Sequence, residues 1–172
     1  MTVLKIIQYP DKLLRRKSQP VTNVLDNKVQ QMASDMLATL KKTKNCAALA
    51  STQLDLEHPL DMIAVNPVPG EAIFKKHPMV FINPKLTKIG PIVSDLEGCM
   101  SICPNRFSAP VPRFEKVVLD ALDCEGNAIH LETSGFLARC LQHECDHLVG
   151  KLFIDYLPPE AINQLAKSYE AR

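Results

Sequence analysis

The sequence lacks an excess of charge of either sign. Of its 172 residues, 20 are Lys or Arg and 19 are Asp or Glu, which gives a formal net charge of +1. Proteins that bind nucleic acid or a membrane surface typically carry a basic patch or stripe. We therefore expect neither a membrane nor a specific nucleic-acid sequence as a partner. The short basic run from Lys12 to Lys17 is interpreted as a solvated helix end.

Long apolar segments are also lacking. No stretch approaches the roughly 20 apolar residues that a membrane-spanning helix needs. The segment Met1 to Pro10 does not combine a basic stretch with a long apolar core, so it is not expected to be a secretory signal. We expect a cytoplasmic protein, in which the six cysteines would be reduced thiols. Each cysteine is then either a packing residue or a carrier of chemistry.

Internal repeats and low-complexity tracts are absent, and the length suits a single domain over residues 1–172. Apolar residues at three- and four-residue spacing predict a helix over 28–40, with Asp26 as its N-cap. Further predicted elements are strands at 62–65 and 79–82, a hairpin of 116–122 with 128–131, a helix from Thr133 or Ser134 to about Val149 with Gly150 as its stop, and an amphipathic helix after Pro159 that carries Ile162, Leu165, Ala166 and Tyr169. This order predicts an α+β domain whose mostly antiparallel sheet surrounds one central helix.

The central helix carries the pattern H-E-x-x-H, formed by His143, Glu144 and His147. Residues four apart lie on the same face of a helix, one turn from each other, so both imidazoles can point at one metal ion. Glu144 can then reach a water molecule on that ion without being a ligand itself. Two surface histidines that happen to be four apart are the alternative, but the chain has only five His in total.

A catalytic site of this kind usually takes three protein ligands and leaves one position open. No histidine follows His147, so the third ligand must be of another type. Asp155 and Glu160 are downstream candidates. Cys99, which follows a glycine upstream, is another candidate, although a buried cysteine is more often a packing residue.

At this point the sequence resembles the peptide deformylase family. That family carries the motifs G-x-G-L-A-A-x-Q, E-G-C-[LM]-S and Q-H-E-x-D-H in this order. The second is matched by Glu97 to Ser101 and the third by Gln142 to His147, whereas the first is matched only in part by Cys46 to Gln53. Other segments that resemble the family are 7–10, 14–15, 20–21, 82–84, 111–113 and 150–153.

The resemblance implies that Cys99, His143 and His147 hold one divalent metal ion. Fe²⁺ is the native ion in many members, and Zn²⁺ or Ni²⁺ can replace it; thiolate and imidazole ligands suit all three. Glu144 would be the general acid and base that moves the proton of the attacking water. Gln53 and the backbone amide of Met100 would donate hydrogen bonds to the oxyanion.

The same resemblance implies residues that contact the substrate or support the metal ligands. Arg106 occupies the position of a family arginine near the substrate path, with simple solvent exposure as the alternative. Asp146 would support the ligands from behind, and Glu97 would pair with Arg113 beside Cys99, unless the two are unrelated surface charges. The expected substrate-binding residues are Ala47, Ala48, Gly98, Arg106, Phe136, Arg139 and Cys140.

The chain departs from the family pattern at two places. Cys46 and Ala48 replace the two glycines of the first motif, which costs little if φ at Ala48 is negative and about 1 kcal/mol if it is positive. Arg139 and Asp95 replace aliphatic residues expected around the pocket for the methionine side chain. We predict that they form an ion pair at the pocket wall, because an unpaired guanidinium there would be costly. The alternative is that both turn outward to water.

These observations leave four functions to compare. The first is a deformylase that removes formyl from the N-terminal methionine of new polypeptides, with N-formylmethionyl peptides and nascent chains as substrates and the ribosome as a candidate partner. The second is a relative with altered acyl-peptide specificity, which the departures favour. The third is a non-catalytic binding protein, which would have no need for Glu144. The fourth is a metalloendopeptidase, which the cysteine ligand disfavours.

Overall fold

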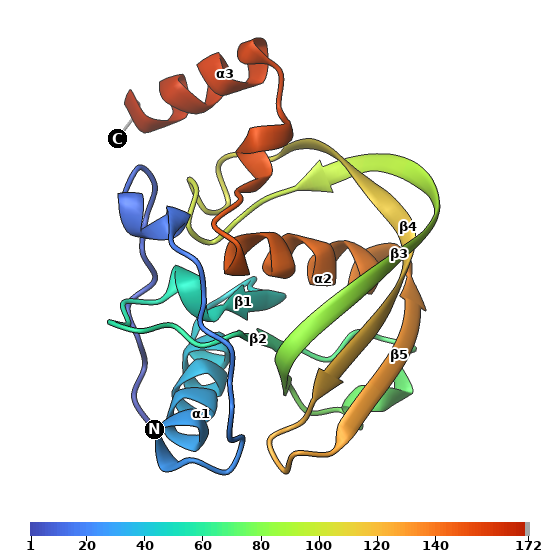
Figure 1. Cartoon of the computed structure of the whole chain (residues 1–172). Coiled ribbons are helices and arrows are strands. Elements are labelled where there is room, and N and C mark those ends of the chain that lie inside the picture. Colours follow the sequence, from blue (N-terminus) through green and yellow to red (C-terminus); the bar gives the residue numbers. More distant parts are fainter. Residues whose placement is uncertain (171–172) are drawn as a thin grey trace.

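The computed structural model describes residues 1–170 of the chain. Within them a five-stranded antiparallel sheet has the order β1-β2-β3-β4-β5, and three α-helices pack around it (Figure 1). The elements are α1 (Asn27–Lys42), β1 (Ala48–Ala50), β2 (Met62–Val65), β3 (Met79–Glu97), β4 (Ala109–Leu122), β5 (Ala128–Ser134), α2 (Gly135–Leu148) and α3 (Pro159–Glu170), with 3-10 turns at Lys12–Arg15, Ser51–Gln53, Ala72–Phe74 and Phe153–Tyr156. The predicted α+β class with a mostly antiparallel sheet is confirmed.

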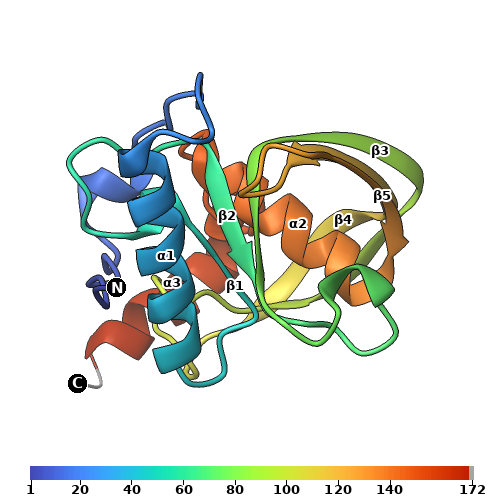
Figure 2. The same ribbon diagram turned by 90° about the horizontal axis from the view of Figure 1, so that it is seen from below.

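Helix α2 lies in the hollow of the curved sheet, while α1 lies outside it beside β1 and β2 (Figures 1 and 2). Strand β2 is buried on both faces because its side chains alternate between the two helices. Met62 and Ala64 belong to the apolar cluster that contains α1. Ile63 and Val65 belong to the cluster that contains α2. One face of β2 therefore packs against the helix that carries the H-E-x-x-H pattern, and the opposite face packs against α1.

A third apolar cluster joins the two ends of the chain to the segment after β3. It includes Ile7, Cys99, Phe107, Phe153 and Leu165. In α3, Leu165 is buried but Ile162 and Ala166 are exposed, so the predicted apolar face of this helix was only partly right. Packing by α3 therefore depends on Leu165 and on the half-buried Tyr169, whose ring centroid lies 5.9 Å from that of Tyr9.

The predicted helix over 28–40 is confirmed with its N-cap, since the carboxylate of Asp26 accepts a 2.8 Å hydrogen bond from the backbone N–H of Lys28. The start of α2 differs from the prediction. Ser134 takes the N-cap position but makes no capping hydrogen bond within the described chain, and the hydroxyl of Thr133 donates to Glu71 instead. Gly150 follows the helix with φ of +76°, as a C-terminal stop requires.

Strand β3 is much longer than the predicted segment 79–82. Most of it beyond Lys85 is exposed, and Pro84 and Pro91 interrupt it, so it lacks the apolar pattern that marks a strand. Both interruptions coincide with shifts in the pairing of β3 with β4, between Ile82 and Lys85 and between Ile89 and Ile92. A proline is tolerated in a strand at such irregular positions.

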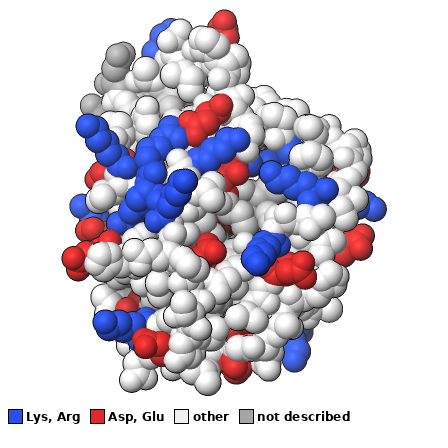
Figure 3. Space-filling model, in the orientation of Figure 1, with Lys and Arg blue, Asp and Glu red and all other residues white. Residues whose placement is uncertain are grey.

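The basic run from Lys12 to Lys17 is not simply a solvated helix end. Arg15 forms a two-point ion pair with Asp155, and the half-buried guanidinium of Arg16 donates to the carbonyls of Leu54 and Leu56. On the face seen in Figure 3, basic side chains gather around this segment and acidic ones lie among them. None of the helices within residues 1–170 is long and apolar enough to cross a membrane.

Candidate metal centre

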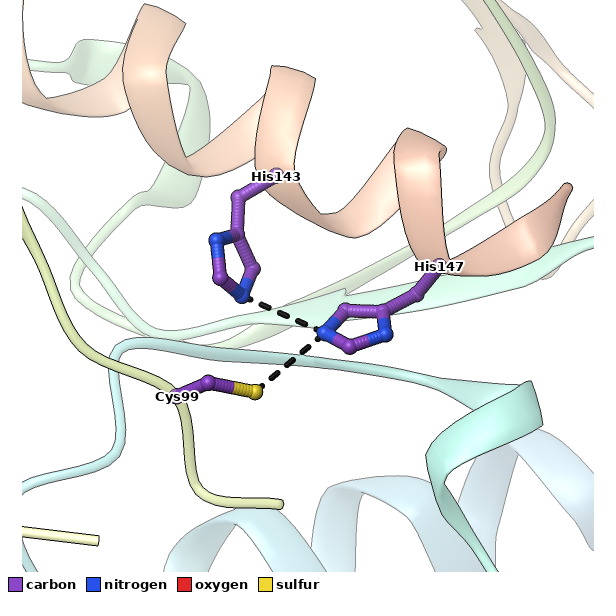
Figure 4. Close-up of side chains that lie close together, drawn as sticks. All are labelled: Cys99, His143 and His147. Atoms are coloured by element: carbon purple, nitrogen blue, oxygen red, sulfur yellow. Dashed lines mark hydrogen bonds between the residues drawn. The ribbon is translucent and has the colours of Figure 1, made fainter. Parts of the chain in front are cut away.

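Three side chains with metal-binding atoms converge between α2 and the segment that follows β3. His143 and His147 lie one turn apart on α2, and Cys99 follows the end of β3 (Figure 4). All three are buried, and their ligand atoms lie within 4.8 Å of one another. The Cys99 sulfur is 3.3 Å from Nε2 of His147, which is 3.2 Å from Nε2 of His143.

This donor set fits a divalent transition-metal ion. One thiolate and two imidazoles supply three ligands and leave a fourth position for water or substrate. Burial, and next the charge of His143, lower the pKa of His147 well below its ordinary value, so the ring is neutral and has a lone pair to offer a cation. Of the other downstream candidates, Asp155 pairs with Arg15 and Glu160 is exposed at the start of α3.

A single buried carboxylate holds the first imidazole. Oε2 of Glu97 lies 2.9 Å from Nδ1 of His143, and Arg113 donates to both oxygens of Glu97 at 2.9 and 3.0 Å. Burial raises the pKa of Glu97, but the hydrogen bonds from His143 and Arg113 outweigh it and bring that pKa to about 2. The predicted ion pair of Glu97 with Arg113 is confirmed.

The same arginine connects the site to two further residues. Arg113 also bonds to Asp146 and lies 3.1 Å from the hydroxyl of Tyr156. That hydroxyl donates to Asp146 at 2.7 Å. Asp146 is thus linked through Arg113 and Glu97 to His143, which is the position expected of a group behind a metal ligand.

Burial alone would lower the pKa of His143, but its contacts with Cys99 and Glu97 raise it well above the ordinary value. A carboxylate at Nδ1 orients the imidazole and increases the basicity of the other nitrogen. The His143 ring is therefore held with Nε2 toward the cluster.

Glu144 is buried beside the cluster and lines the adjoining pocket. Burial, its largest influence, raises the pKa of this carboxyl to about 7. Its Oε2 is one of the few buried side-chain atoms without a hydrogen-bond partner within residues 1–170. Such an atom is costly unless a bound molecule pairs with it.

Gln53 reaches the cluster from the segment after β1. Its Oε1 accepts a 2.8 Å hydrogen bond from the backbone of Ala50, which leaves the amide nitrogen as a donor. That nitrogen lies 3.4 Å from the sulfur of Cys99 and 3.1 Å from the hydroxyl of Ser101. Met100 lines the pocket, and its carbonyl accepts from Gln8.

A pocket of about 460 Å³ opens over these residues. Every residue expected at the substrate lines it, and Arg106 does so as an exposed side chain. The residues concerned are Ala47, Ala48, Gly98, Arg106, Phe136, Arg139 and Cys140. Sequence reasoning missed further lining residues, which are Asn45, Leu96, Asn105, Phe107 and Ser108.

The ion pair predicted between Arg139 and Asp95 is wrong. Nη1 of Arg139 lies 2.9 Å from Oε1 of Glu97, whereas it reaches only the backbone carbonyl of Asp95, at 3.4 Å. The Asp95 carboxylate is exposed and accepts from the next backbone amide in its own strand. The partly buried guanidinium of Arg139 pairs with the buried carboxylate of Glu97, not with the exposed carboxylate of Asp95.

The glycine replacements in the first motif do not strain the backbone. Neither Cys46 nor Ala48 has a positive φ, and Ala48 lies in β1 opposite Val65. A positive φ, of +57°, occurs instead at Asn45, the residue just before Cys46. Asparagine adopts this conformation more readily than most residues, and it was the available signal for a bend at the pocket rim.

Comparisons with known proteins agree with this geometry. Residues 3–163 match the sequence model described as polypeptide deformylase. A peptide deformylase from Buchnera aphidicola is 38% identical over 170 residues, covering 99% of this chain and 92% of the relative. One from Blochmanniella pennsylvanica is 40% identical over 169 residues, covering 97% and 91%.

Solved structures agree as well. The chain is similar to a peptide deformylase from Legionella pneumophila, with a TM-score of 0.85, 31% identity, and coverage of 99% of this chain and 95% of the other. It is also similar to a peptide deformylase from Ehrlichia chaffeensis in complex with actinonin, with a TM-score of 0.85, 30% identity, and coverage of 100% and 99%. The chain therefore belongs to the polypeptide deformylase family.

Proposed function

We propose that this chain is a metal-dependent hydrolase that removes the N-formyl group from the N-terminal methionine of newly made polypeptides in the cytoplasm. The carrying observation is the buried set of one sulfur and two ring nitrogens within 4.8 Å, next to a pocket that Glu144 lines. Cys99, His143 and His147 are the proposed ligands. The ribosome is a proposed partner, since the substrate emerges from it.

The bound metal would supply a water molecule that is activated near neutral pH and would polarise the formyl carbonyl. Fe²⁺, Zn²⁺ and Ni²⁺ all fit the donor set. Cys99 and the two histidines orient that chemistry toward the pocket.

Glu144 is the proposed general acid and base. Its Oε2 has no partner within the described chain, and the side chain lines the pocket. It can accept a proton from the attacking water and deliver it to the leaving amine. Protonation of the leaving nitrogen means that a neutral amine departs and not a high-energy amide anion.

Gln53 and the backbone N–H of Met100 are the proposed donors to the oxyanion. The amide nitrogen of Gln53 faces the sulfur of Cys99, and both residues line the same pocket. Donors that are fixed before the reaction stabilise the charge that develops in the transition state.

We propose formyl-Met peptides as substrates despite the arginine in the pocket. Both terminal nitrogens of Arg139 already donate to the protein, to Glu97 and to the carbonyls of Val93 and Val111. The guanidinium is thus already hydrogen-bonded within the protein. The aliphatic part of the side chain remains to contact a methionine side chain. The structural relative from Ehrlichia chaffeensis is a complex with actinonin.

Turnover of formyl-Met-Ala-Ser by protein loaded anaerobically with Fe²⁺ tests the proposal. We expect free amine and formate in equal amounts, no activity in the metal-free protein, and no cleavage of the internal peptide bonds. Formyl-Nle-Ala-Ser, which has an isosteric side chain, should be turned over at a similar rate. Loaded protein that releases formate from neither peptide would overturn the assignment.

A further inference from the structure

The contacts of Arg139 reach beyond the substrate pocket, to the carboxylate that holds His143. It lies on α2 one turn before His143, and only 12% of its side chain is exposed. Its Nη1 lies 2.9 Å from Oε1 of Glu97 and 2.8 Å from the carbonyl oxygen of Val111 on β4. Its Nη2 lies 2.9 Å from the carbonyl oxygen of Val93 on β3. The guanidinium is therefore fixed from three sides.

We infer that Arg139 is a positioning residue for the metal centre, which fixes the carboxylate of Glu97 and, through it, the imidazole of His143. This inference rests on the metal ligands of the proposed function and adds a residue to their support. It concerns a position where the family resemblance leads one to expect an aliphatic side chain, which has no hydrogen bond to offer.

Glu97 contacts two residues of the same helix, Arg139 and His143. Oε1 of Glu97 is bound by Arg139, and Oε2 is bound by His143, four residues further along α2. Glu97 thus forms hydrogen bonds with two successive turns of α2. A rotation of the carboxylate that improved one of these hydrogen bonds would break the other.

Arg113 completes the set of donors from the opposite side, on β4. Its Nε binds Oε1 and its Nη2 binds Oε2, so each carboxylate oxygen receives two donors. Arg113 is itself shared with Asp146 and Tyr156. Without Arg139, Nε of Arg113 would remain as the donor to Oε1, and the carboxylate would follow the movements of Arg113.

Oε2 of Glu97 is placed to accept the ring N–H at Nδ1 of His143, 2.9 Å away. That hydrogen bond selects the tautomer whose Nε2 faces the metal. The carbonyls of Val93 and Val111 prevent the guanidinium from swinging into the pocket. Arg139 thereby acts on the metal without touching it.

The test compares metal binding in Arg139→Leu, Arg139→Lys and wild-type protein. Lys116→Leu is the control, because it removes an exposed cation on β4 that does not line the pocket. Each protein is loaded with Co²⁺, its visible spectrum is recorded, and release of the ion to a chelator is timed. Contacts behind metal ligands are worth about 10–100-fold in affinity.

We expect Arg139→Leu to release Co²⁺ about 10–100-fold faster than wild type and to show an altered ligand-field spectrum. Arg139→Lys should recover most of the loss, because an ammonium can still donate to Glu97, and Lys116→Leu should match wild type. Wild-type release and spectrum in a folded Arg139→Leu protein would overturn the inference. So would equal losses in the leucine and lysine variants.

Folding is checked by circular dichroism of the metal-free proteins. If the leucine variant does not fold, Arg139→Met keeps an apolar stem of similar length without a donor and takes its place under the same criteria. None of these readouts uses a formylated substrate. A wild-type protein that binds Co²⁺ but releases no formate would therefore refute the proposed function alone.

Discussion

The amide nitrogen of Gln53 lies 3.4 Å from the sulfur of Cys99, although the two residues are 46 positions apart in the chain. Because Oε1 of Gln53 is engaged by Ala50, the side chain cannot turn without losing that bond. The NH₂ group is therefore held as a donor beside the group of Cys99, His143 and His147. This is the arrangement expected of a group that binds an oxyanion.

Gln53→Leu should lower kcat by roughly 10²–10³-fold, the usual cost of losing an oxyanion donor. The Michaelis constant should change much less, because the donor acts mainly where charge develops. Steady-state kinetics on formyl-Met-Ala-Ser give both values. An effect confined to the Michaelis constant would mean that Gln53 binds the ground state only.

Glu144→Gln should keep the metal and lose about 10²–10⁴-fold in turnover, since the amide preserves the shape of the side chain but cannot accept the proton. The ratio of metal to protein and the rate are measured on the same preparation. Loss of the metal together with activity would instead show that Glu144 supports the ligands.

The sequence was sufficient to predict the helix that brings His143 and His147 together, and the family resemblance supplied Cys99 as their neighbour. Two histidines four apart fix a helix face, and α1 follows from spacing and a capping aspartate. Long-range pairing was harder to predict. The exposed half of β3 shows no apolar alternation, and its assignment as a strand depends on hydrogen bonds to β4 that no local pattern contains.

The contacts of Arg139 show the same limit at the site. Sequence reasoning placed it correctly on the face of α2 that carries His143. It paired Arg139 with Asp95 because both replace aliphatic residues expected around the pocket. Glu97 was already assigned to Arg113, and sequence alone does not show that one carboxylate can serve two guanidinium groups and an imidazole. That arrangement requires β3, β4 and α2 to meet.

Thr52→Val should destabilise the fold by about 1 kcal/mol, the typical value of one buried hydrogen bond. The Thr52 hydroxyl donates at 2.9 Å to the backbone carbonyl of His147, at the end of α2. Valine has nearly the same shape, so packing is retained. Urea unfolding of the metal-free variant measures the change, and an unfolding free energy equal to that of wild type would show that the bond contributes nothing.

Gly150→Ala should be among the most damaging single changes outside the pocket. Gly150 has φ of +76°, and an added Cβ would lie 2.8 Å from the carbonyl carbon of Arg15 and 3.2 Å from the carbonyl oxygen of Arg16. Gly126, in the turn between β4 and β5, has φ of +85° but open space where its Cβ would be. Comparing alanine substitutions at Gly150 and Gly126 therefore separates the cost of backbone strain from the cost of steric overlap.

We expect Gly126→Ala to cost about 1–2 kcal/mol, from the left-handed backbone alone. Gly150→Ala should cost about 1–3 kcal/mol more, because backbone atoms must move to relieve the overlap. Urea unfolding of both metal-free variants gives the two values. In the segment that would be displaced, the Ser18 hydroxyl donates to the carbonyl of Leu148, next to the proposed ligand His147. Gly150→Ala should therefore weaken Co²⁺ binding, while Gly126→Ala should leave it unchanged. Equal unfolding costs for the two variants would show that the segment at Arg15 yields freely and does not hold the end of α2.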